Sequence, residues 1–263
     1  MKVIKKIKNS ELHINSVTSE IENMLFTLTK NSYPEKWNTE FCTELLLKNL
    51  HNILHNKKIE VPGDTLHISC QPYKLKGESE KYLGDLAFIV TNSYYDQDII
   101  EGVSYYSIAC KDQNKNSFSK IRKDHLKRLN SSAHHALLLL FDYDNITGLA
   151  FPASPEAIIG HQPYNWKQWA PFTNCAVVQN CTAIELNEKN SSLYKFGIPF
   201  SYQICHRYLF GLDLDYSNIA IESAKGQRSD KGNPTYLCLL SISHGKNEHL
   251  DFDIHSDLYR QLL

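Results

Sequence analysis

The sequence predicts an α/β fold with a mixed central sheet, because helical and strand-like hydrophobic patterns alternate along the first half of the chain. Residues 38–56 place their leucines on one face at helical spacing. Three runs rich in β-branched, aromatic and aliphatic residues follow, and they predict strands at 65–71, 85–91 and 103–110. The polar residues 92–102 predict a hairpin connection between the last two.

A second amphipathic helix and a further strand complete this half. Residues 117–130 combine apolar positions at helical spacing with intervening basic side chains. Residues 136–141 are wholly apolar, as expected for a strand buried on both faces. A further helix is predicted at 17–29, and from 38 onward the expected order is helix, three strands, helix, strand.

The second half is less regular. Its patterns predict a strand at 147–151, a short helix from 154, one or two strands within 176–186, a helix at 200–210 and a strand at 236–242. We therefore expect residues 1–150 to form the core and residues 151–263 to form an α+β extension packed on the same domain.

Composition restricts the class of protein. The net charge of -1 provides no global attraction to a polyanion, so any such attraction would have to come from a local cluster of basic residues. The seven cysteines include no Cys-x-x-Cys pair, which favours a reducing compartment over a disulfide framework. The N-terminus lacks a signal-peptide pattern, and no apolar run is long enough to span a membrane. We expect a soluble, cytoplasmic protein without a membrane partner.

Two segments carry a resemblance to a known family. Gly84-Asp85-Leu86-Ala87-Phe88-Ile89-Val90 opens the second predicted strand, and Ser104-Tyr105-Tyr106-Ser107-Ile108-Ala109-Cys110-Lys111 ends the third. The layout resembles the PD-(D/E)XK nuclease superfamily, in which an Asp opens the second strand and the third ends in an acidic residue or Gln, any residue, then Lys. The resemblance covers about residues 38–142 and implies a restriction-endonuclease-like αβββαβ core.

The resemblance also implies a chemistry. Hydrolysis of a phosphodiester needs a divalent cation, Mg²⁺ or Mn²⁺, that neutralises the scissile phosphate and holds the attacking water. Asp85 and Glu40 would be the metal ligands, and Lys111 the catalytic base or the cation facing the transition state. Glu40 is preferred to Glu44, because it lies about 80° from the centre of the apolar helix face and Glu44 about 120°.

The sequence departs from the family pattern at Ala109, where an acidic residue or Gln is expected. Residues 107, 109 and 111 share one face of the strand, so neighbouring acids point away. Ser107 could contribute a hydroxyl, and Asp112 could turn toward the site at the end of the strand. A site that lacks one ligand binds metal more weakly, which leaves open a degenerate nuclease fold used for binding or assembly.

A basic cluster follows Lys111 directly. Seven basic residues stand against two acidic ones between Lys111 and Arg128. A solvated helix face is the commoner explanation of such a run, but its position beside the expected site favours phosphate contacts. The candidate DNA-binding residues are Lys115, Lys120, Arg122, Lys123 and Lys127.

Three functions remain open. The leading hypothesis is a metal-dependent DNA endonuclease, for which the resemblance implies a bacterial defence or DNA-processing system and a protein partner or homo-oligomer. The second is a catalytically inactive nuclease-fold subunit that binds DNA or scaffolds a complex. The third is an unrelated α/β protein with its site near Trp166, Trp169 and His206.

Overall fold

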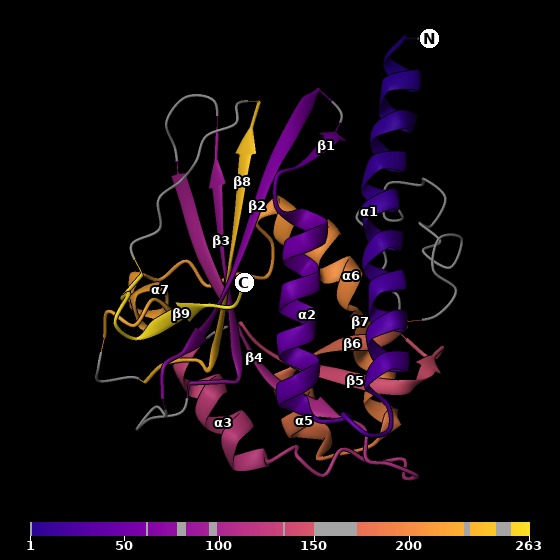
Figure 1. Cartoon of the computed structure of the whole chain (residues 1–263), viewed down its shortest axis with the longest axis vertical. Coiled ribbons are helices and arrows are strands. Elements are labelled where there is room, and N and C mark those ends of the chain that lie inside the picture. Colours follow the sequence, from indigo (N-terminus) through magenta and orange to yellow (C-terminus); the bar gives the residue numbers. More distant parts are fainter. Residues whose placement is uncertain are drawn as a thin grey trace.

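The computed structural model places a mixed β-sheet at the centre of the chain, with helices on both faces (Figure 1). It describes residues 2–61, 63–77, 83–94, 99–133, 135–149, 173–228, 232–245 and 254–263, with side chains from residue 13 onward. The expectation of a mixed α/β fold is therefore confirmed.

Within the described residues the sheet has nine strands, in the order β1-β2-β8-β3-β4-β5-β6-β7, with β9 pairing with β2 beside that path. Their bounds are β1 Lys57–Val61, β2 Asp64–Leu75, β3 Leu86–Ser93, β4 Ile99–Cys110, β5 Ala136–Ile146, β6 Thr173–Gln179, β7 Gly197–Pro199, β8 Tyr236–His244 and β9 Tyr259–Gln261. Two neighbouring pairs are parallel, β3 with β8 and β4 with β5, and the other pairs are antiparallel.

The helices divide between the two faces of the sheet. The long helix α1 and helix α2 cover one face together with the α6–η4 segment, and α3, α5 and α7 belong to the other. The helical bounds are α1 Lys2–Ser32, α2 Thr39–Leu54, α3 Lys123–Ser132, α5 Asn180–Leu186, η2 Ser191–Phe196, α6 Phe200–Tyr202, η3 Gln203–Arg207, η4 Tyr208–Phe210 and α7 Asn218–Ala224. Alternate residues of each central strand therefore enter different apolar clusters.

Strand β8 lies in the middle of the sheet, although it belongs to the last part of the chain. It pairs with β2 on one side and with β3 on the other. Its residues 236–243 are all buried, as a strand in the centre of a sheet between helix layers requires. The sheet therefore takes strands from both sides of residue 150, where the sequence suggested a boundary.

Most predicted strands are present. Of the one or two strands expected within 176–186, one is present: β6, which ends at Gln179 and is followed by helix α5. Two other expectations were wrong. The helix expected at 117–130 begins only at Lys123. Residues 147–149 form no strand, because β5 continues to Ile146 instead. The short helix expected from 154 lies outside the described residues.

Candidate functional site

Asp85 is fixed at the start of β3 by contacts with both neighbouring strands. Its backbone N–H donates to the Tyr106 carbonyl (2.7 Å), and its carbonyl accepts from the Tyr236 N–H (2.9 Å). Strand β3 begins only at Leu86, and the Asp85 carboxylate continues its pairing with β4 by accepting from the Ile108 N–H (2.6 Å). The carboxylate is therefore held where the two strands separate.

Gly84 makes this placement possible. Its φ of +88° lies in the left-handed region, and a Cβ at this position would stand 3.0 Å from the Tyr106 carbonyl oxygen. Only glycine takes this backbone conformation at low cost and allows β4 to approach so closely. The turn at Gly84 thus sets the position of Asp85.

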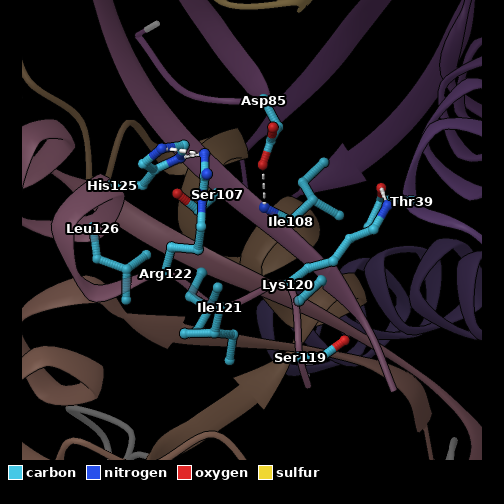
Figure 2. A pocket seen from close by; sticks show the side chains of 12 residues that line it. Thr39, Asp85, Ser107, Ile108, Ser119, Lys120, Ile121, Arg122, His125 and Leu126 are labelled. Carbon is cyan, nitrogen blue, oxygen red and sulfur yellow. Dashed lines mark hydrogen bonds between the residues drawn. The ribbon is translucent and has the colours of Figure 1, made fainter. Parts of the chain in front are cut away.

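Asp85 faces a cavity of about 520 Å³ between the end of β4 and the segment that leads into α3. Besides Asp85, its polar lining comprises Thr39, Ser107, Ser119, Lys120, Arg122 and His125. In Figure 2, Asp85 lies between two pairs of side chains, Arg122 with His125 on one side and Lys120 with Thr39 on the other. This volume falls in the range of small-molecule and cofactor sites.

The segment that carries the cavity's cations is firmly held. The Asp112 carboxylate accepts hydrogen bonds from the hydroxyls of Ser117 (2.6 Å) and Ser119 (2.5 Å) and from the Ser119 N–H (3.0 Å). Phe118 is fully buried, and its N–H donates to the Lys189 carbonyl (2.7 Å). These contacts hold residues 117–119 outside helix α3 and explain why α3 begins at Lys123 and not at 117.

Lys120 and Arg122 bring positive charge to the cavity. Lys120 donates to the Thr39 hydroxyl (2.8 Å) at the start of α2. Arg122 donates to the His125 ring, which must keep a lone pair to accept. Burial, and then the charge of Arg122, lower the pKa of His125 below its ordinary value of 6.5. His125 is therefore mainly neutral at pH 7.

The structure does not bring Lys111 into this cavity. Because β4 and β5 are parallel and Cys110 pairs with Phe141, the residues that follow them lie side by side. The Lys111 ammonium contacts Asp142 (3.1 Å) and Asp144 (2.9 Å). Burial works against its charge, but these two carboxylates raise its pKa above the ordinary value, so it is a poor general base near pH 7.

Lys111 compensates a buried carboxylate. Asp142 is 2% exposed, and its other oxygen accepts from the Tyr194 hydroxyl (2.6 Å). The Lys111 carbonyl in turn accepts from the Trp37 indole N–H (2.8 Å). This network at the ends of β4 and β5 gives Lys111 a structural role.

Glu40 and Asp85 line a second, smaller cavity on the α2 side of the sheet, about 250 Å³ in volume. Glu40 is mostly exposed and accepts from the Lys74 ammonium (2.8 Å), which also contacts Glu44 (2.5 Å). The hydrogen bonds that Lys74 donates to these two glutamates raise the pKa of its ammonium group. The carboxylate of Glu40 is thus already paired with a cation.

These residues fit Mg²⁺ poorly. One oxygen of Asp85 is engaged by the Ile108 N–H, Glu40 is paired with Lys74, and Ala109 supplies no ligand atom. Among the described residues, no group of three or more His, Cys, Asp or Glu side chains could hold a metal ion. The larger cavity combines an apolar lining with two cations, Lys120 and Arg122, and several hydroxyl groups.

The other sequence candidates lie apart from the cavity lining. Lys115 and Lys127 are exposed and Lys123 is half-buried. His206 packs against Tyr202 on the α1 side of the sheet (ring centroids 4.6 Å apart), and burial lowers its pKa to about 4. Trp166 and Trp169 lie outside the described residues. Sequence reasoning missed His125, for which the i, i+3 spacing from Arg122 is the only signal.

No protein-family model matches the chain, and neither do the curated proteins or the solved structures with which it was compared. What the structure defines is thus a mixed α/β domain with a cavity at the end of β4 that two cations and one carboxylate line. None of the described helices is both long enough and apolar enough to cross a bilayer.

Proposed function

We propose that this chain binds the phosphate backbone of DNA in the cavity beside Asp85, as a nuclease-like domain with a reduced cleavage machinery. One observation carries the proposal. Lys120 and Arg122 line the cavity with Asp85, whereas Lys111 is paired with Asp142 and Asp144. The cavity therefore offers positive charge and hydroxyl donors, which suit phosphate oxygens.

The nuclease-like layout supports the choice of DNA as ligand. Helix α2, strands β2, β3 and β4, helix α3 and strand β5 follow one another in the αβββαβ order, with β1 and the central β8 added. The resemblance further predicts a bacterial defence or DNA-processing system and a protein partner or homo-oligomer. Binding without cleavage agrees with the loss of the acidic residue at Ala109.

The test is fluorescence anisotropy with a labelled DNA duplex over a series of salt concentrations. Lys120→Ala and Arg122→Ala should each weaken binding about tenfold, the typical worth of a charge-assisted hydrogen bond. Each should also reduce the salt slope by about 0.9 for every phosphate that the variant no longer neutralises. Lys48→Ala, an exposed lysine on α2 that lines neither cavity, is the matched control. Unchanged binding by both cavity variants would reject the proposal.

Metal-dependent cleavage of DNA is the second candidate, and one observation favours it: Asp85 and Glu40 line the same smaller cavity. Mg²⁺ is often held by only one or two carboxylates together with substrate phosphates. A plasmid-nicking assay with Mg²⁺ or Mn²⁺ tests this candidate. Nicking that disappears in both Asp85→Asn and Glu40→Gln would establish cleavage. If the wild type does not nick the plasmid, DNA binding stays as the only proposed function.

A further inference from the structure

Ser107 has a buried hydroxyl that no part of the fold satisfies. The residue is 7% exposed, lies on β4 on the same face as Ala109 and lines the larger cavity. Its Oγ has no hydrogen-bond partner within the residues that the structure describes. An unsatisfied buried hydroxyl costs folding free energy, so its position calls for an explanation. A ligand oxygen in the cavity supplies one.

The formal charge of the cavity restricts that ligand. Lys120 and Arg122 contribute two positive charges and Asp85 one negative charge, and His125 accepts from Arg122 as a neutral ring. The sum is one positive charge. An internal phosphate of a DNA strand carries one negative charge, whereas a terminal phosphate carries about -1.5 to -2 at pH 7. The cavity is thus matched to an internal phosphate.

We infer that Ser107 donates a hydrogen bond to an internal phosphodiester of DNA that lies between Lys120 and Arg122. This inference rests on the proposed function and adds the contact and the phosphate class. The Ser107 hydroxyl is a single donor from β4, and the two cations come from the segment that leads into α3. In the inferred complex, each of the three groups contacts one oxygen of the same phosphate.

Ser107→Ala separates this role from a structural one. The variant should bind a labelled DNA duplex about tenfold more weakly, since a hydrogen bond to a charged group is removed. Its melting temperature should stay the same or rise, because removal of an unsatisfied hydroxyl does not weaken the fold. Ser131→Ala, an exposed serine on α3, should change neither quantity. Unchanged affinity in Ser107→Ala would overturn the inference.

The phosphate class has its own test. The same single-stranded oligonucleotide should bind equally well with and without a 5′-phosphate, and inorganic phosphate should compete weakly. A tenfold preference for the phosphorylated end would overturn the assignment to an internal phosphate. If Lys120→Ala and Arg122→Ala weaken binding but Ser107→Ala does not, this inference fails and the proposed function stands. If none of the three weakens it, both fail.

Discussion

Glu22 on α1 makes the stability of this protein depend on pH near neutrality. Its side chain is 7% exposed and accepts from the Ser201 hydroxyl, while Oε2 has no partner among the described residues. The nearby Thr173 hydroxyl donates instead to the Cys175 carbonyl (3.2 Å). Burial raises the pKa of Glu22 from 4.5 to about 7, against the smaller opposing effect of the hydrogen bonds.

The sign of the effect follows from the raised pKa. Below pH 4.5 the carboxyl is protonated in both the folded and the unfolded chain. Between pH 4.5 and 7 the unfolded chain has lost its proton and the folded chain keeps it, so stability falls as the pH rises. The gap between the two pKa values corresponds to about 3 kcal/mol, fully lost above pH 7.

Glu22→Gln removes this loss, because an amide has almost the same shape and no charge. At pH 8 the variant should be more stable than the wild type by up to about 3 kcal/mol, and near pH 4.5 the two should be nearly equal. Urea unfolding at several pH values measures the difference. Glu35→Gln, an exposed glutamate, is the control. A stability difference that is independent of pH would refute the reasoning.

Three further predictions follow from the site. Lys111→Ala should destabilise the fold by about 3–5 kcal/mol in urea unfolding, because it leaves the buried Asp142 without its cation. A loss of stability below about 1 kcal/mol would show that Lys111 does not compensate the charge of Asp142. Gly84→Ala should lower stability by about 1–3 kcal/mol, since its φ is +88° and β4 lies close by; an unchanged melting temperature would show that the turn relaxes freely. Asp112→Ala should weaken DNA binding several-fold in the anisotropy assay by releasing the loop that carries Lys120, and full affinity would mean that this loop needs no anchor.

The strands that the sequence predicted best are those whose patterns do not depend on their neighbours. The apolar run at 136–141 specifies a buried strand wherever it pairs. The run at 236–242 was predicted as a strand for the same reason, but its position between β2 and β3 was not. An apolar strand has the same sequence pattern wherever it lies in the sheet. Strands adjacent in sequence usually pair with each other, so the pattern gave no reason to place this strand between β2 and β3.

The site was predicted only in part, because its geometry depends on register. The turn at Gly84 places Asp85 beside a cavity, and Lys120 and Arg122 line it with Asp85. Lys111 shares a strand face with Ala109 by alternation, yet it lies one residue beyond the end of β4, where its ammonium meets carboxylates from β5. That meeting requires the pairing of β4 with β5, which no local pattern contains.

Because β8 lies in the centre of the sheet, the sheet cannot be completed until the last part of the chain has been synthesised. Cys70 on β2 and Cys238 on β8 are 168 positions apart in sequence, and their sulfur atoms lie 3.6 Å apart. Until β8 has been synthesised, β2 and β3 have no strand to join them, and their edges stay open to other chains. Contacts between such distant segments slow folding. A ribosome-bound fragment that ends before Tyr236 would therefore hold two unconnected half-sheets, exposed to aggregation unless a chaperone shields them.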